Sequence, residues 1–341
     1  MKTLRTLLRY TIAAIATVVI LASLLSLVHD VSYWYSKALD FPRLQYLLVA
    51  LACLPAFVLL NRRWNPAAVA LLLGLVATIV IQGRLVLPYL VGPTSVPDVT
   101  AAEAEATADG RNTVGILIAN VLITNRRADE FLAIVRERDP DMVLTMEVDE
   151  WWMERLAPLD AAYPYRMAYP TDNGYGMALH SRFPLRDAET KFFNEPDVPS
   201  FHARVELPSG RTFRFHGMHP LAPVPSKKYP DNEGEKEVAF GKLAELIAAD
   251  PAPRIVAGDY NDVSWSHTAR LFEQAGELAN VRLGRGLYNS FDAHSPLMRW
   301  PLDHFFVSPE FALDELQRLA GFGSDHFPMY ARFVLRGEGD R

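Results

Sequence analysis

Acid, amide and imidazole side chains recur at the ends of apolar runs in residues 111–341 of the chain. In the stretch GFGSDHFPMY, for example, Asp325 and His326 stand side by side between a glycine turn and the last apolar run. Taken alone, each such residue is explained as a turn, cap or surface residue. The set combines carboxylate oxygens, which suit Mg²⁺ or Mn²⁺, with amides and imidazoles, which suit phosphate oxygens. The positions are Asn120, Glu147, His219, Asp259, Asn261, Asp303, His304, Asp325 and His326.

Strand ends on one side of a layered sheet meet at a common edge, where binding sites are often built. The sequence therefore predicts one convergent polar pocket. Its carboxylates could hold a divalent cation, and an acid beside a histidine could fix the tautomer of the ring. His304, adjacent to Asp303, could line the rim of this pocket. Hydrolysis of a phosphate ester is a reaction that would use all of these groups.

Apolar runs of strand length alternate with helical patterns over the same part of the chain. Buried strands are expected at 113–121, 141–148 and 254–261, and the runs YGMALHS, FHARVEL and TFRFHGM are expected to pair antiparallel. Helices are expected at 126–138, capped by Asn125, at about 233–249, capped by Asn232 with Glu235, and from about Ser266. Buried strands mixed with hairpins and helices predict an α+β or layered α/β domain.

The order and spacing of the polar residues resemble the endonuclease/exonuclease/phosphatase superfamily, which has the fold of DNase I. The likeness covers roughly residues 111–337. Asn120 matches the asparagine of the family's first strand. Glu147 in PDMVLTMEV matches its metal-binding glutamate, with Met146 where glutamine is common. GYGMALHSRFPL also resembles a family segment, and the other matches are His219, Asp259 and Asn261 in AGDYND, Asp303 in LDH, and Asp325 with His326 in SDH.

The resemblance implies a layered α/β sandwich of two mixed β-sheets flanked by helices, and attack of water on a phosphate ester assisted by Mg²⁺ or Mn²⁺. AP endonucleases of this superfamily have an aspartate two residues after the first asparagine, where this chain has Leu122, so abasic-site repair is not expected. The implied roles are metal binding by Glu147, Asp325 and Asn120, phosphate binding by Asn120 and Asn261, and catalysis by Asp259, His326, His219 and Asp303.

The N-terminal part of the chain is different, because it contains three long apolar stretches. A helix of about 20 apolar residues crosses the hydrocarbon core of a bilayer. We therefore expect a membrane region at 1–92 with transmembrane helices at about 10–28, 44–61 and 66–91. A cleaved signal peptide is the alternative for the first of them. A linker is expected at 93–112, the catalytic domain at 113–337 and a short tail at 338–341.

Basic residues predict the orientation of these helices. Lys2, Arg5 and Arg9 precede the first stretch, and Arg62 and Arg63 fill the loop between the second and third. This places the N-terminus inside and the catalytic domain on the extracytoplasmic side of a bacterial inner (plasma) membrane. With three such stretches the chain most resembles membrane-attached bacterial members of the YafD-like kind. The only cysteine, Cys53, lies in the second stretch, so the catalytic domain has no disulfides.

The expected partners are a phosphate-ester substrate and the lipid bilayer, and no protein partner is inferred. The substrate stays open between a nucleic acid and a phospholipid or small phosphoester. Residues 111–341 carry 26 Lys and Arg against 34 Asp and Glu, a net charge of −8. Binding of DNA depends on basic residues, and the basic pairs in this part are Arg126-Arg127 and Lys227-Lys228. A third possibility is a domain that binds a partner without catalysing a reaction. Loss of motif residues would favour it, but every motif residue is present.

Overall fold

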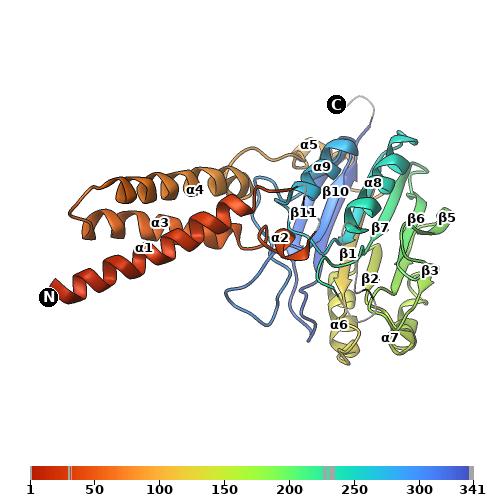
Figure 1. Ribbon diagram of the computed structural model, residues 1–341. Helices are drawn as coiled ribbons and strands as arrows, with labels where there is room; N and C mark the ends of the chain where they lie inside the picture. Colours follow the sequence, from red (N-terminus) through yellow and green to blue (C-terminus); the bar gives the residue numbers. More distant parts are fainter. Residues whose placement is uncertain (1, 30, 32, 226–228, 230–234, 338–341) are drawn as a thin grey trace. The chain divides into compact units, whose positions relative to one another are not determined.

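The computed structural model describes residues 2–29, 31, 33–225, 229 and 235–337 (Figure 1). Three sequence-based expectations fall outside these residues: the tail at 338–341, the pair Lys227-Lys228 and the helix cap at Asn232. The chain divides into two compact units, residues 1–92 and 93–341, which are described separately below.

The first unit is helical. It contains α1 (Lys2–Leu25), α2 (Trp34–Ala38), α3 (Arg43–Leu60) and α4 (Pro66–Leu90). The three longer helices are long and apolar enough to cross a membrane. Asn65 begins α4, because its side chain accepts a hydrogen bond from the N–H of Ala68 at 2.9 Å. The buried Gln82 of α4 donates to Ser23 of α1 at 2.8 Å and accepts from Arg43 of α3 at 3.2 Å, so one side chain links all three helices.

Residues 93–112, expected to be a linker, begin the second unit. Thr100 and Glu103 form a capping box at the start of α5 (Ala101–Ala106). Just before this helix the backbone lies along β11 (Phe311–Arg318). The N–H of Val99 donates to the carbonyl of Leu313 at 3.0 Å, and the N–H of Leu313 donates to that of Pro97 at 2.9 Å.

Two six-stranded sheets form the frame of the second unit, and each mixes parallel and antiparallel pairs. Sheet A has the order β11-β12-β1-β2-β4-β3, and sheet B has the order β5-β6-β7-β8-β10-β9. The strands of sheet A other than β11 are β1 (Thr113–Asn120), β2 (Met142–Met146), β3 (Tyr165–Tyr169), β4 (Met177–Ser181) and β12 (Met329–Leu335). Those of sheet B are β5 (Leu185–Phe192), β6 (Pro199–Glu206), β7 (Thr212–Met218), β8 (Arg254–Asp259), β9 (Ala279–Asn280) and β10 (Asp303–Val307).

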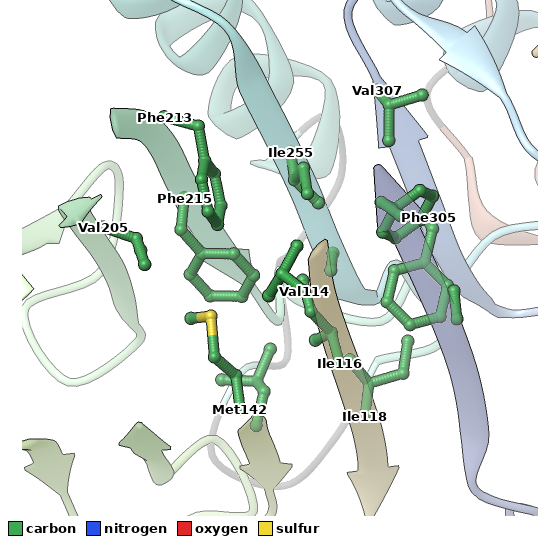
Figure 2. Close-up of a cluster of buried hydrophobic side chains, with 14 of the residues drawn as sticks. Val114, Ile116, Ile118, Met142, Val205, Phe213, Phe215, Ile255, Phe305 and Val307 are labelled. Atoms are coloured by element: carbon green, nitrogen blue, oxygen red, sulfur yellow. The ribbon is translucent and has the colours of Figure 1, made fainter. Parts of the chain in front are cut away.

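Alternation along β1 shows how the layers are held together. Val114, Ile116 and Ile118 point into the core between the two sheets, where they join side chains of β2, β6, β7, β8 and β10 (Figure 2). Leu117 and Ala119 point the other way, into a second cluster. A strand that is buried on both faces reads as a continuous apolar run, as TVGILIAN does.

Helices cover the outer faces of both sheets (Figure 1). The helices α6 (Ala128–Arg138) and α7 (Glu150–Leu156), followed by the 3₁₀ turn η1 (Ala157–Leu159), pack on sheet A. The helices α8 (Glu235–Ala248) and α9 (His267–Ala275) pack on sheet B. The layered fold with two mixed sheets flanked by helices, predicted from the sequence, is confirmed.

Strand pairing differs from the expectation in one respect. The runs FHARVEL and TFRFHGM do pair antiparallel, as β6 and β7. The run YGMALHS, which contains β4, was expected to join them, but β4 lies between β2 and β3 in sheet A. The chain passes from one sheet to the other between β4 and β5, so the pairing predicted for β4 is wrong.

Candidate active site

The predicted site residues come from strand ends of both sheets. Asn120 ends β1 and Glu147 follows β2, both in sheet A. Asp259 ends β8 and Asp303 begins β10, both in sheet B. The site therefore lies where the two sheets meet, and His326 reaches it from the segment that leads into β12.

Asn120 connects the two sheets. Its Nδ2 donates to Glu147 Oε1 at 2.8 Å and to Asp259 Oδ2 at 3.0 Å. Its Oδ1 accepts from the N–H of Leu122 at 3.0 Å, which sets the orientation of the amide. The nitrogen of Asn120, and not its oxygen, therefore faces the carboxylates.

Glu147 is held in an uncommon backbone conformation, with φ at +62°. Its Oε2 accepts from the N–H of Ile123 at 3.1 Å, in addition to the bond from Asn120. Burial raises the pKa of the Glu147 carboxyl, and the negative charge of Asp325 raises it further, while the two hydrogen bonds act in the opposite direction. The backbone strain and the raised pKa occur together at this residue, a combination that functional sites often show.

His326 lies between two carboxylates. Its Nδ1 is 2.7 Å from Asp303 Oδ2, and its Nε2 is 3.5 Å from Asp259 Oδ2. Burial lowers the pKa of the imidazole, but the charges of Asp303 and Asp259 outweigh burial and raise the pKa to about 10. The ring is therefore an imidazolium at neutral pH, and it packs 4.9 Å from the ring of Phe291.

Asp259 needs the glycine that precedes it. Gly258 has φ at +145°, and a Cβ there would lie 1.9 Å from the carbonyl oxygen of Met218. The neighbouring strand therefore approaches too closely for any side chain. The N–H of Asp259 donates to Met146 Sδ at 3.0 Å, so the end of β2 in sheet A contacts the end of β8 in sheet B.

His219 is buried and lies close to Asp259. Its Nε2 is 3.7 Å from Asp259 Oδ2, and within the described part of the chain its Nδ1 has no hydrogen-bond partner. Burial lowers the pKa of this imidazole to about 4, so His219 is neutral at pH 7. Its ring packs 5.0 Å from the ring of Tyr175.

Asn261 supports the site from the backbone side. Its N–H donates to Asp259 Oδ1 at 2.8 Å, and its Nδ2 donates to the carbonyl of Pro220 at 3.0 Å. The residue has φ at +50°. The side chain therefore ties the segment after His219 to the Asp259 turn.

Asp325 is half-buried beside His326. Burial raises the pKa of its carboxyl, the charge of His326 lowers it, and that of Asp259 raises it again. Ser324, the residue before it, donates from Oγ to the carbonyl of Asn120 at 2.7 Å and accepts from the N–H of His326 at 3.1 Å. This serine fixes the SDH segment against β1.

His304 is not at the rim of the pocket, contrary to the expectation. Its side chain is fully buried on the opposite face of β10 from Asp303, because successive side chains of a strand alternate. Its Nε2 lies 2.9 Å from the carbonyl oxygen of Asp262, and its ring stacks on Phe306 at 5.4 Å. His304 is a packing residue.

Two contributing residues were not singled out from the sequence. Ser290 Oγ accepts from the N–H of Asp303 at 3.1 Å and from that of Leu302 at 3.2 Å, and so fixes the start of β10. Tyr175, which packs on His219, accepts from the N–H of Ala222 at 3.1 Å. Tyr175 could have been found from the GYG of the quoted segment, whereas nothing in the sequence distinguishes Ser290 from other loop serines.

The donor chemistry fits a divalent cation. Candidate ligand atoms of Asp259, Asp303 and His326 all lie within 4.8 Å of one another. Because the ring of His326 is protonated, it offers no lone pair to a cation and instead balances one carboxylate charge. Glu147 and Asp325 add two further carboxylates whose pKa values are raised, in part, by neighbouring negative charge. Hard carboxylate oxygens gathered with such an excess of negative charge suit Mg²⁺ or Mn²⁺.

Comparison with known proteins identifies a family. Residues 117–326 match the Endonuclease/Exonuclease/phosphatase family. No curated protein matches the chain. Three solved structures with a similar fold are an endonuclease/exonuclease/phosphatase from Bacteroides vulgatus, a humanized D. rerio TDP2 with 14 mutations, and the human Nocturnin catalytic domain with bound sulfate.

These likenesses extend over nearly the whole of each solved structure. The Bacteroides vulgatus protein is 17% identical, with a TM-score of 0.55 over 66% of this chain and 99% of that one. The D. rerio protein is 18% identical, with a TM-score of 0.54 over 65% and 99%. The human domain is 17% identical, with a TM-score of 0.52 over 66% and 95%. At these identities the structures show a shared fold, and the family match covers more than half of the chain. The chain therefore belongs to the endonuclease/exonuclease/phosphatase family, whose members are metal-dependent hydrolases of phosphate esters.

Proposed function

We propose that the chain is a membrane-anchored, nuclease-like phosphodiesterase that depends on Mg²⁺ or Mn²⁺. The observation that supports this most directly is the set of contacts around Asp259, whose Oδ2 lies 3.0 Å from Asn120 Nδ2, 3.5 Å from His326 Nε2 and 3.7 Å from His219 Nε2. One carboxylate oxygen surrounded by an amide and two imidazoles is a suitable place for a water molecule beside a phosphate.

Glu147 and Asp325 would hold the cation. When bound, such a cation polarises a phosphate oxygen and stabilises the leaving oxygen. Asn120 is better oriented for a phosphate than for the cation, because its Nδ2 faces the site and its Oδ1 accepts from Leu122. The dual role that the family resemblance implies for Asn120 is thereby reduced to phosphate binding in this proposal.

Asp259 would orient the attacking water and accept its proton. The water oxygen forms a bond to phosphorus while the bond from phosphorus to the leaving oxygen breaks. His326, charged and held by Asp303, would donate its Nε2–H to a phosphate oxygen. Because phosphoryl transfer depends mainly on positioning and charge stabilisation, these fixed donors supply the main contribution of the protein. His219, which is neutral, would add a further donor, and Asn261 would keep the Asp259 turn in place.

A nucleic acid is the substrate that the comparisons favour. One solved structure with this fold, 19% identical and with a TM-score of 0.53, is D. rerio TDP2 in complex with a single-strand DNA product. A phospholipid or small phosphoester is the second candidate, and the three apolar helices favour it because they would keep the catalytic unit near lipid. We further propose that these helices span a bacterial inner membrane with the catalytic unit outside, as the distribution of Lys and Arg indicates.

The test uses the full chain in detergent with Mg²⁺ or Mn²⁺. Supercoiled plasmid, sphingomyelin in mixed micelles and a soluble phosphomonoester are assayed in parallel, with EDTA as the metal-free control. Metal-dependent nicking would support the nuclease, and turnover of lipid or monoester without nicking would support the second candidate. Asp259→Asn and His326→Ala should each abolish turnover without loss of fold. Asp314→Asn, at an exposed ion pair with Arg332, is the matched control. Wild-type rates in Asp259→Asn would show that the site is misplaced.

A further inference from the structure

Two arginines flank the residue that follows His326. The guanidinium carbon of Arg299 lies 5.0 Å from the centre of the Phe327 ring, and that of Arg318 lies 4.6 Å from it. Arg299 belongs to the long segment between β9 and β10, and Arg318 is the last residue of β11. Nineteen residues apart in the sequence, the two side chains converge on the ring of the residue next to His326.

Backbone contacts fix both side chains. Arg299 donates to the carbonyls of Asp292 at 3.3 Å and Ala293 at 3.2 Å, and Arg318 donates to the carbonyl of Asn289 at 2.8 Å. The segment that contains Ala293 also contacts the residue before His326, because the N–H of Ala293 donates to the carbonyl of Asp325 at 2.7 Å. The two guanidiniums are therefore held in place relative to His326.

Neither guanidinium has an acidic partner among the residues that the structure describes. Other exposed arginines of the same unit are paired, as Arg166 is with Asp160 at 3.0 Å. Burial lowers the pKa of Arg318, and the positive charge of Arg299 lowers it further. Two like charges therefore contact one aromatic ring without an acidic partner among the described residues, an arrangement that an anion would stabilise.

We propose that Arg299 and Arg318 bind a second phosphate of the substrate, next to the phosphate that is hydrolysed. The proposal rests on the proposed function and narrows its substrate class to a short single strand of nucleic acid, in which phosphates follow one another at regular intervals. A phospholipid with one phosphate would leave this subsite empty. The net charge of −8 in residues 111–341 argued against nucleic acid, but the fold brings two of their cations together on the ring of the residue that follows His326.

The experiment compares three trinucleotides. TpTpT has two charged phosphodiester linkages. In each of the other two, one linkage is replaced by a neutral methylphosphonate, so that a single charged and cleavable phosphodiester remains. The full chain in detergent with Mg²⁺ should hydrolyse TpTpT with a kcat/KM about tenfold or more above that of either neutralised version. This ratio should fall to about two or less in Arg299→Gln and in Arg318→Gln. Arg318→Lys should keep part of it, because lysine retains the charge but loses the planar fork.

The ratio is an internal control for folding, because a variant that is merely destabilised loses activity on all three substrates equally. Arg186→Gln, at an exposed ion pair with Glu206, should leave the ratio unchanged. An unchanged ratio in Arg299→Gln and Arg318→Gln would overturn the subsite while leaving phosphodiester hydrolysis intact. If the wild type hydrolyses none of the three, the proposed function fails. The subsite is then tested by measuring the equilibrium binding of the same trinucleotides to Asp259→Asn. Tighter binding of TpTpT than of the neutralised versions, lost when Arg299 is also replaced, would support the subsite. Equal binding of all three would refute it.

Discussion

His326 Nδ1 lies 2.7 Å from Asp303 Oδ2, although His326 belongs to the segment that leads into β12 of sheet A and Asp303 begins β10 of sheet B. Both side chains are buried, so water cannot screen the pair. A carboxylate in this position orients the ring and stabilises its charged form. Despite burial, the pKa of His326 is therefore raised to about 10, and Nε2 keeps its proton at neutral pH.

Replacing Asp303 by asparagine should separate orientation from charge. The amide oxygen can still accept the Nδ1–H, but the pKa of His326 should fall because the nearest negative charge is gone. We expect kcat/KM to fall by about 10²–10⁴-fold, as in catalytic dyads of this type. A raised pKa means that the charged ring is present below it and is lost as pH rises through it. The alkaline limb of the pH–rate profile, near pH 10 in the wild type, should therefore move to lower pH. The idea fails if the limb stays where it was.

Protons and the cation should compete for the acidic groups. Burial and neighbouring charge raise the pKa values of Glu147 and Asp325, and a divalent cation binds only their ionised forms. Activity should therefore decline on the acid side at a pH above that of ordinary carboxylates. Raising the Mg²⁺ concentration should move this acid limb to lower pH. Profiles recorded at two Mg²⁺ concentrations test this, and superimposable acid limbs would contradict it.

Glu147→Gln should weaken the binding of the cation. The amide keeps the shape of the side chain and one acceptor oxygen but loses the charge that hard cations prefer. We expect the Mg²⁺ concentration for half-maximal activity to rise tenfold or more, with little change in melting temperature. Glu154→Gln, on the exposed face of α7, is the control. If titrations of activity with Mg²⁺ superimpose for wild type and Glu147→Gln, Glu147 does not bind the cation.

Gly258→Ala should destabilise the fold more than most single changes do. The added Cβ would meet the carbonyl oxygen of Met218 at 1.9 Å, in a backbone conformation that side chains rarely adopt. We expect the free energy of unfolding to fall by about 3 kcal/mol or more. Gly241→Ala, in the interior of α8 with no atom within 4 Å of the new Cβ, should instead raise it by about 0.5–1 kcal/mol. Denaturant titration of both variants decides the matter, and equal effects would contradict the steric explanation.

Elements buried on both faces could be predicted from the sequence, and half-exposed ones could not. The strand expected at 113–121 matches β1 to within one residue, because nearly all of its side chains are buried. The edge strands β3, β5 and β11 were missed, because most of their side chains are exposed or only partly buried and give no apolar run. Local polar contacts also shifted one boundary. Asn125 was expected to cap the helix of residues 126–138, but its Oδ1 accepts from the N–H of Arg127, and α6 begins at Ala128.

The same limit applies to the site. Motif residues at strand ends, such as Asp259 and Asp303, were found because their spacing is local. Asp303 reaches the site and His304 does not, because they occupy opposite faces of β10. The sequence does not show which face is which, since the strand is buried on both sides. The convergence of Arg299 and Arg318 on Phe327 depends on the path of a long loop, and no local pattern encodes it.

The bond from Asn120 to Asp259 crosses from sheet A to sheet B, and the contact of His326 with Asp303 joins the segment before β12 of sheet A to β10 of sheet B. Apolar side chains hold the two sheets face to face, and such contacts tolerate small sliding movements better than hydrogen bonds do. A displacement of about 1 Å can reduce a reaction rate by about 10²-fold. The rate of turnover therefore depends on the relative position of the two sheets. On warming, this rate should decrease at temperatures at which both sheets are still folded.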